Sequence, residues 1–199
     1  MREADRIREC MRALDSLDAR AKLNARECLI AMGPVVVDRL IGAVHSETIH
    51  QTWEVASVLA EVDDPRCVQL MEEILTSRNP LLGSVAVRAL QKRGKESVIR
   101  LLEALPQCKM LVQIGIVEAL EKIGDPQAVG PLMELLRSTS APTLRYTIIQ
   151  ALGMLGDPQA IELIRTFQDD PDQHVQKRAQ IALERLESTL GGTPARWAS

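Results

Sequence analysis

The sequence has few aromatic residues and no excess of positive charge. Phe, Trp and Tyr make up 2% of the chain, which is too few for the stacking platforms that hold single-stranded nucleic acids. Proteins that bind phosphate backbones rely on clustered Lys and Arg, whereas this chain has a formal net charge of −3 and a pI near 5.7. These values predict that nucleic acid is not a partner.

Long hydrophobic runs are also missing from the sequence. No apolar run approaches the roughly 18 residues that predict a transmembrane helix. The first residues, MREADRIREC, carry both signs of charge and lack the apolar centre of a secretory signal. Hydrophobic residues make up 46% of the chain, which is too many for a disordered protein. We therefore predict a folded cytoplasmic protein without membrane insertion.

The four cysteines lie far apart and form no C-x-x-C pair; they are Cys10, Cys28, Cys67 and Cys108. Structural zinc sites use close pairs of ligands, and disulfide frameworks are typical of short secreted chains. The spacing therefore predicts buried, reduced thiols and no metal site. Because Cys108 follows Pro106 in an expected loop, we predict that it is the most exposed of the four.

The sequence does contain an internal repeat of about thirty residues. The pentapeptide GDPQA occurs at 124–128 and again at 156–160. Ala-Leu pairs recur at steps of 30, 32 and 31 residues, at Ala89-Leu90, Ala119-Leu120, Ala151-Leu152 and Ala182-Leu183. Val58-Leu59 and Cys28-Leu29 continue the same register towards the N-terminus. A recurrence of this length predicts stacked units that share one apolar interior.

The apolar spacing within each repeat predicts two helices joined by a short break. Val112, Ile116 and Leu120 recur at helical intervals, and Gly124-Asp125-Pro126 follows them. Gly commonly ends a helix, Asp caps the next helix, and Pro suits its first position. The predicted helices are 2–16, then the first helices 19–32, 48–62, 80–93, 110–123 and 142–155, the second helices 34–45, 65–76, 95–105, 126–137 and 158–168, and a closing helix 172–188. In the closing helix we expect Ile181 to face inward and Gln176 to face outward.

Units that read AL..LGDP.AV..L...L resemble HEAT repeats, particularly the short type found in phycobilin lyases. The resemblance implies an all-α fold, a right-handed α-solenoid of about five to six helical hairpins with an N-terminal capping helix. We expect the array to cover residues 1–190, and residues 191–199 to form a flexible tail or linker. HEAT repeats serve mostly as binding scaffolds, so the resemblance implies little about the particular function.

No arrangement of residues predicts an enzyme or a cofactor site. His45 and His50 could form a metal site, but a solvated loop is the favoured interpretation of this stretch. Deoxyhypusine hydroxylase, an enzyme built from such repeats, holds iron with His-Glu pairs, whereas the histidines of this chain precede Ser, Gln and Val. DNA glycosylases of related architecture need a basic channel, which this mixture of charges does not predict. The glycine patterns of phosphate-binding loops are missing as well.

Polar and charged residues recur along the predicted second helices, which line the concave face if the array curves as its relatives do. They give a candidate partner-binding set of Arg66, Gln69, Glu73, Arg100, Glu103, Glu134, Glu162 and Arg165. Mixed charge of this kind favours correct register and fast association with a protein or peptide. We therefore predict a non-catalytic scaffold that needs no cofactor and binds a protein or peptide partner. One alternative is a phycobilin-lyase-like enzyme or lyase subunit that handles a tetrapyrrole. Another alternative is a regulatory or sensor domain of a larger protein.

Overall fold

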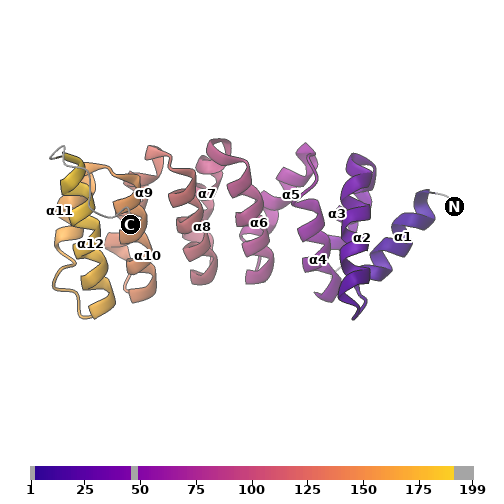
Figure 1. The fold of residues 1–199 in the computed structure, drawn as a ribbon, viewed down its shortest axis with the longest axis horizontal. Coiled ribbons are helices and arrows are strands. Elements are labelled where there is room, and N and C mark those ends of the chain that lie inside the picture. The colour runs from indigo at the N-terminus through magenta and orange to yellow at the C-terminus, as the bar shows by residue number, and fades with distance from the viewer. Residues whose placement is uncertain (1–2, 46–48, 191–199) are drawn as a thin grey trace. The chain divides into compact units, whose positions relative to one another are not determined.

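The computed structural model describes residues 3–45 and 49–190, and every regular element in these ranges is helical (Figure 1). The prediction of an all-α helical repeat is therefore confirmed. The chain divides into two compact units, Met1–Lys92 and Arg93–Ser199, each with its own packing. The predicted single array over 1–190 stays a prediction, and the predicted tail at 191–199 lies outside the described residues.

Six α-helices account for most of the described part of the first unit: α1 Glu3–Leu14, α2 Ala19–Met32, α3 Val37–His45, α4 Ile49–Leu59, α5 Pro65–Leu75 and α6 Pro80–Lys92. The helices pack in sequence order, since α1 lies against α2, α3 against α4, and α5 against α6. A 3-10 turn, η1 Gly33–Val36, leads into α3. Local hairpins therefore build this unit.

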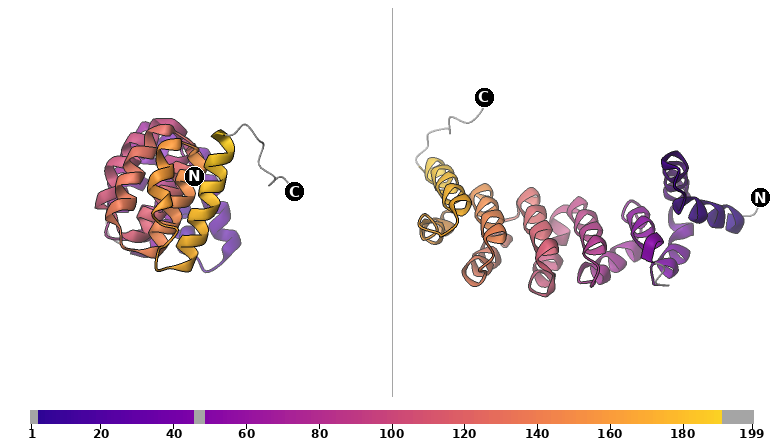
Figure 2. Two further views of the ribbon diagram at one scale, coloured as in Figure 1. Left: turned by 90° about the vertical axis from the view of Figure 1, so that its left-hand side faces the viewer. Right: turned by 90° about the horizontal axis from the view of Figure 1, so that it is seen from below.

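The second unit contains α7 Val98–Ala104, α8 Met110–Ile123, α9 Val129–Ser138, α10 Pro142–Leu155, α11 Ile161–Arg165 and α12 Gln173–Leu190. Four 3-10 turns accompany them: η2 Gly94–Ser97, η3 Leu105–Gln107, η4 Pro126–Ala128 and η5 Pro158–Ala160. Helix α10 packs against both α8 and α12, and the three lie side by side in Figures 1 and 2. The first helices of successive repeats therefore form one layer of this unit.

The Gly-Asp-Pro breaks have the structure that the sequence predicts. Gly124 and Gly156 end α8 and α10 with φ values of 70° and 76°, a region that side chains with a Cβ rarely adopt. Asp125 then accepts a hydrogen bond from the backbone N–H of Gln127 at 2.9 Å, which caps the next helical turn. Asp157 repeats this cap on Gln159 at the same distance. The repeated pentapeptide is therefore a structural break between two helices.

Most predicted helix boundaries agree with the structure, since 19–32, 110–123 and 142–155 coincide with α2, α8 and α10. Several second helices begin later than predicted, because their first turn is a 3-10 turn. In the repeat after Asp125, the N–H of Ala128 bonds to the carbonyl of Asp125 at 3.1 Å, which tightens the first turn. Helix α11 is also shorter than predicted and ends at Arg165.

The repeated leucine of each Ala-Leu pair lies in the core. Leu29, Leu59, Leu90, Leu120 and Leu152 have no exposed surface, and Leu183 is 5% exposed. Full burial of one such side chain stabilises the fold by roughly 1.5–3 kcal/mol. The small residue before the leucine is also buried in five of the six pairs; in the remaining pair, Cys28 is half-buried. This column therefore makes the shared interior of each unit.

Two residues of the closing helix differ from the sequence-based expectation. The repeat pattern places Ile181 inward and Gln176 outward, but Ile181 is 44% exposed and Gln176 is half-buried. The Gln176 amide donates a hydrogen bond to the carbonyl oxygen of Asp170 at 2.6 Å. The chain before α12 therefore occupies the side of the helix that the pattern assigns to solvent.

Close packing of α10 on α12 depends on a glycine. A Cβ added to Gly153 would lie 2.8 Å from the Cβ of Ala182 and 3.1 Å from its Cα. Carbon atoms in good contact are about 3.5–4.0 Å apart, so no larger residue fits without separating the helices. The small residues at this contact therefore set how closely the two helices approach.

The segment Ala19–His45 reaches the length and mean hydropathy of a membrane span, contrary to the prediction that no run comes close. This segment is not one straight helix. Helix α2 has 14 residues and α3 has nine, and Gly33 between them has a φ of 61°. A span needs about 20 helical residues, and neither helix is that long.

Candidate partner-binding surfaces

Three of the predicted binding residues, Arg66, Gln69 and Glu73, lie on α5 of the first unit. Arg66 is held by its own chain. Its guanidinium donates to Asp38 Oδ1 at 2.6 Å, to the carbonyl of Pro34 at 3.1 Å, and to Asp64 at 2.8–2.9 Å. Arg66 therefore joins α5 to the preceding repeat, and we assign it a mainly structural role.

The carboxylate of Asp64 is the cap of α5 as well as a partner of Arg66. It accepts a hydrogen bond from the backbone N–H of Arg66 at 2.8 Å. The side-chain and backbone hydrogen bonds from Arg66 lower the pKa of Asp64 to about 2. The side-chain bonds to Asp64 and Asp38 raise the pKa of the Arg66 guanidinium, so both partners stay charged over the ordinary pH range.

Gln69 and Glu73 are exposed on the same helix. Gln69 has no side-chain hydrogen bond to any residue that the structure describes. The Glu73 carboxylate lies 3.7 Å from Nδ1 of His45, the last residue of α3. His45 thus has an acidic neighbour on α5, whereas the alternative metal pairing with His50 involves a side chain outside the described residues.

The second unit carries the other five predicted residues, Arg100 and Glu103 on α7, Glu134 on α9, and Glu162 and Arg165 on α11. All five have exposed side chains. The structure brings two of them into contact, since Arg165 pairs with Glu162 at 2.7 Å. Arg165 also reaches Glu187 of α12 at 3.1 Å, which makes it a link between helices.

Glu103 and Glu134 are the residues of this set whose carboxylates make no hydrogen bond or ion pair with any described residue. Arg100 differs, because its guanidinium donates to the carbonyl of Glu96 at 3.3 Å. An exposed carboxylate without an internal partner is fully available to a cation or N–H group of another molecule. Glu103 and Glu134 are therefore the strongest binding candidates of the second unit.

Polar contacts along the first helices were not predicted from the sequence. In the first unit, Lys22 of α2 pairs with Glu54 of α4 at 3.1 Å. Glu61, just after α4, lies 3.8 Å from Arg26 of α2 and 2.5 Å from Lys92 of α6. The hydrogen bond from Lys92 is the largest of the effects that lower the pKa of Glu61. The paired residues are about one repeat apart in the sequence, so a search for opposite charges at the repeat spacing would have found them.

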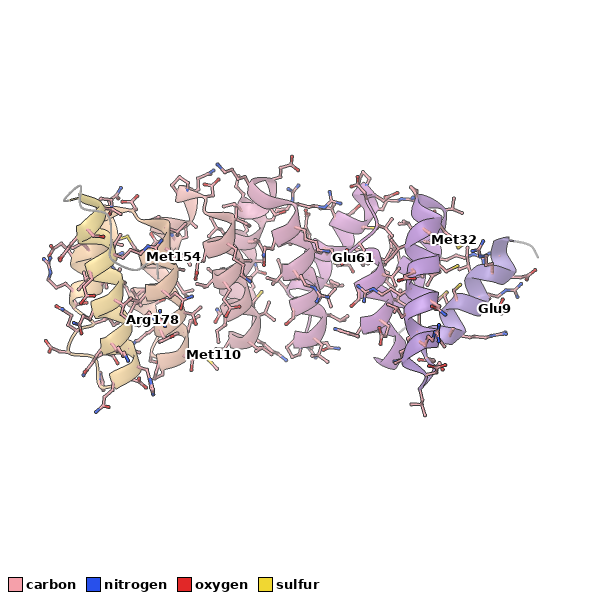
Figure 3. The ribbon with its side chains drawn as sticks, viewed as in Figure 1. Glu9, Met32, Glu61, Met110, Met154 and Arg178 are labelled. Carbon is pink, nitrogen blue, oxygen red and sulfur yellow. The ribbon has the colours of Figure 1, made fainter. Side chains whose placement is uncertain are left out.

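The second unit has a comparable row on its first helices. Gln150 of α10 donates to Glu121 of α8 at 3.0 Å. Arg178 of α12 stacks over the ring of Tyr146, with 4.3 Å between the guanidinium carbon and the ring centre, and donates to its hydroxyl. Figure 3 labels Arg178 on α12 and the exposed Met154 on α10, on the side of these helices that faces the viewer. Side-chain contacts between neighbouring repeats therefore occupy part of the surface of the first helices.

The cysteines do not form a reactive site. All four are free, and Cys67 is buried as predicted, whereas Cys10, Cys28 and Cys108 are half-buried. Burial was therefore overestimated for Cys10 and Cys28, and Cys108 falls in the same exposure class as these two. Burial and a side-chain hydrogen bond with Cys28 raise the pKa of Cys10 to about 11. Burial also raises the pKa of Cys108. A thiol with a raised pKa carries little of the nucleophilic thiolate at neutral pH. Among the described residues, no three His, Cys, Asp or Glu side chains are grouped to hold a metal ion.

The fold is an all-α helical repeat, and its likeness is to HEAT and armadillo repeat proteins. A family model for HEAT repeats matches residues 101–184, so the resemblance that the sequence predicts is confirmed. The chain is 27% identical over 167 residues to the uncharacterized phycocyanin operon protein Z of Pseudanabaena tenuis, covering 78% of this chain and 82% of that protein. The similarity therefore extends well beyond the residues that the family model matches.

Solved structures support the same class of fold. Human deoxyhypusine hydroxylase in complex with glycerol is 19% identical, with 91% of this chain and 84% of that chain covered and a TM-score of 0.54. A designed armadillo repeat protein in complex with peptide (KR)4 is 14% identical, with 90% and 99% covered and a TM-score of 0.54. An engineered protein is 21% identical, with 92% and 96% covered and a TM-score of 0.53. At these identities the likeness concerns the fold alone.

Proposed function

We propose that this protein is a non-catalytic scaffold whose second helices bind a protein or peptide partner. Gln69 and Glu73 of α5 are the candidate contacts of the first unit, and Glu103 and Glu134 are those of the second. Arg66 supports the contacts of the first unit by fixing α5, the helix that carries both of them. Neighbouring exposed side chains of the same helices would add to the binding energy.

One observation carries the proposal. Glu73 and Glu134 occupy the same repeat position, eight residues after Pro65 and Pro126, and both are exposed. The equivalent residues of the other repeats are Gly42, Ala104 and Thr166. Core packing explains the leucine column of the repeat but does not explain two exposed acids at an equivalent place. A designed armadillo protein of similar fold binds the peptide (KR)4, which supports peptide recognition by a helical repeat surface.

Site-specific photo-crosslinking in cells tests this proposal. A photoreactive amino acid in place of Glu134 should give one dominant protein adduct, identified by mass spectrometry. The matched control is the same substitution at Glu118, an exposed acid on the first helix α8 of the same unit. Equal adducts from both positions, or none from Glu134, would contradict binding by the second helices.

A phycobilin-lyase-like activity is the second candidate function, and the relative from a phycocyanin operon is the observation in its favour. In that case the protein, alone or with a partner subunit, would handle a tetrapyrrole. Titration of the purified protein with a linear tetrapyrrole should then shift the absorbance spectrum of the pigment. An unchanged spectrum at micromolar protein and pigment would exclude direct pigment binding by the isolated chain.

The third candidate, a regulatory or sensor domain of a larger protein, uses the same binding surfaces. It differs from the scaffold proposal in whether further domains are joined to this chain, and the gene sequence beyond Ser199 decides between them. A partner captured through Glu134 would be consistent with either architecture.

A further inference from the structure

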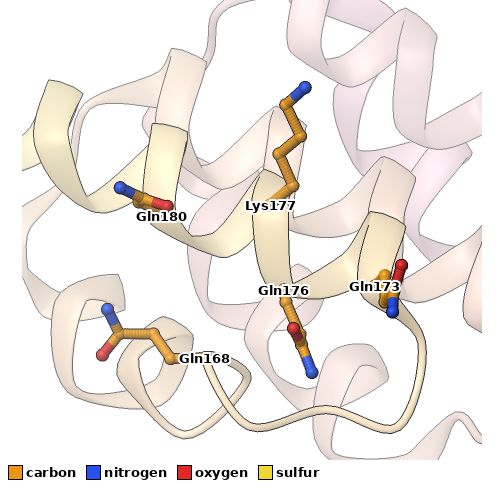
Figure 4. A pocket seen from close by; sticks show the side chains of 5 residues that line it. All are labelled: Gln168, Gln173, Gln176, Lys177 and Gln180. Carbon is orange, nitrogen blue, oxygen red and sulfur yellow. The ribbon is translucent and has the colours of Figure 1, made fainter.

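A polar pocket of about 370 Å³ lies in the second unit, between α12 and the connection that follows α11 (Figure 4). Its lining consists of Gln168, Gln173, Gln176, Lys177 and Gln180. The pocket exists because α11 has five residues whereas α9 has ten, so residues 166–172 leave the helix early and run beside α12. Figure 4 shows Gln168 on this connection and the other four side chains on α12.

The connection is held firmly, so the pocket has a fixed wall. Arg145 of α10 pairs with Asp170 at 2.9 Å, and the Asp170 side chain is 4% exposed. The same guanidinium lies 5.7 Å from the ring centre of Phe167. Gln176 fastens the connection to α12 through its hydrogen bond to the carbonyl of Asp170 at 2.6 Å. A ligand would therefore meet a pre-organised surface, which reduces the entropic cost of binding.

Several polar groups of the lining are free to bind a ligand. The side chains of Gln168, Gln173 and Lys177 make no hydrogen bond or ion pair with any residue that the structure describes. A glutamine amide offers one acceptor oxygen and two N–H donors, which matches the N–H and C=O groups of a peptide backbone. Gln180 makes one exposed bond, to Glu184 at 3.1 Å.

The lining has one formal charge, the ammonium group of Lys177. Three acids lie on the connection, and none of them lines the pocket. Asp170 is paired with Arg145, whereas Asp172 caps α12 by accepting a hydrogen bond from the backbone N–H of His174 at 2.8 Å. Asp169 is the remaining acid of the connection. A ligand with one negative charge therefore complements this surface.

We propose that the pocket binds an acidic segment of the partner peptide, with a carboxylate on Lys177 and backbone amides on Gln168 and Gln173. This inference rests on the proposed function and gives the partner a chemical character. The volume is near the lower end of the roughly 300–1,000 Å³ of ligand pockets, so it accommodates one or two residues of the partner. The pocket is thus an anchoring point for a longer contact.

The test is an NMR titration of the full-length, ¹⁵N-labelled protein. The probe is the capped tripeptide acetyl-Gly-Glu-Gly-amide, and its neutral counterpart is acetyl-Gly-Gln-Gly-amide. We expect the glutamate peptide to shift the side-chain amide signals of Gln168 and Gln173, with at least fivefold weaker binding of the glutamine peptide. Lys177→Gln should lower the affinity for the glutamate peptide to that for the glutamine peptide. Lys122→Gln, an exposed change on α8, should leave the affinity for the glutamate peptide unchanged.

Other outcomes would overturn the proposal. Equal binding of both peptides, or no shift of the two amides at millimolar peptide, removes the acidic-segment assignment. If acetylglutamate alone binds as tightly as the tripeptide, the pocket takes a small carboxylate and not a peptide. A partner that is captured through Glu134 and is indifferent to Lys177→Gln refutes the pocket but leaves the proposed function standing. No captured partner, together with Lys177-dependent peptide binding, refutes the scaffold surface instead.

Discussion

Replacing Gly153 by alanine should destabilise the second unit, although alanine is the better helix former. The added Cβ would lie 2.8 Å from the Ala182 Cβ, so α10 and α12 must separate by about 1 Å to restore normal contact. Overpacking of a core costs about 1–3 kcal/mol. The gain in helix propensity from Gly to Ala, about 1 kcal/mol, offsets part of this cost. We expect a net loss of about 1 kcal/mol in the free energy of unfolding, within a range of about 0–2 kcal/mol.

Gly42→Ala is the control for this experiment. Gly42 is exposed within α3, and an added Cβ would meet no atom within 4 Å. This change should leave stability unaltered or raise it by up to about 1 kcal/mol. The two variants should therefore differ by about 2 kcal/mol in urea unfolding followed by circular dichroism. Thermal melting should show the same order, with about 2–4 °C for each kcal/mol.

A second substitution separates crowding from other causes. Ala182→Gly removes the atom that the new Cβ meets, so the double variant with Gly153→Ala should recover much of the lost stability. Such a recovery appears in a double-mutant cycle as a coupling energy. If Gly153→Ala is as stable as the control Gly42→Ala variant, or if Ala182→Gly only adds to its loss, the packing argument is wrong.

Three further predictions concern single side chains. Because the folded pKa of Asp64 is lowered to about 2, its charge contributes stability above about pH 4, and this contribution is lost as the pH falls towards 2. The difference in free energy of unfolding between the parent protein and Asp64→Asn should therefore shrink over that range. A constant difference would count against the Arg66 pairing. Ser57→Ala should stabilise the first unit by about 1 kcal/mol in urea unfolding, because the buried Ser57 hydroxyl has no hydrogen-bond partner in the described part of the chain; a loss of stability would show that the hydroxyl is satisfied. Cys10 has a pKa of about 11, so its rate of reaction with iodoacetamide should rise about tenfold per pH unit from about pH 7 to 9. If the rate, followed by peptide mass spectrometry, levels off near pH 9, the pKa is not raised.

The repeat architecture could be predicted from the sequence because it depends on strong local signals. The positive φ of Gly124 and the cap of Asp125 arise from short-range chemistry that any copy of GDPQA repeats. The leucine column is equally predictable, since a residue at the same helical position meets the same neighbours in each repeat. Buried Leu120 and Leu152 illustrate this agreement.

The remaining features depend on contacts that one repeat does not contain. Ile181 is exposed and Gln176 is half-buried because α11 ends early and the connection after it covers another side of α12. Arg66 resembles a free surface cation in the sequence, yet its partner Asp38 lies on a different helix. The sequence therefore predicts on which helices these charged residues lie. It does not predict which of them are already paired within the protein.

The salt bridges that join α2, α4 and α6 also limit how freely the repeats can be exchanged. Glu61 needs a cation on the helix before it and another on the helix after it, Arg26 and Lys92. A copy of α4 and Glu61 that was placed elsewhere in the chain would lose at least one of these partners, because no later repeat has a cation at the position of Arg26. The order of repeats in the first unit thus depends on matched charges as well as on apolar packing. Exchanging whole repeats should therefore destabilise this unit more than point substitutions at exposed positions do.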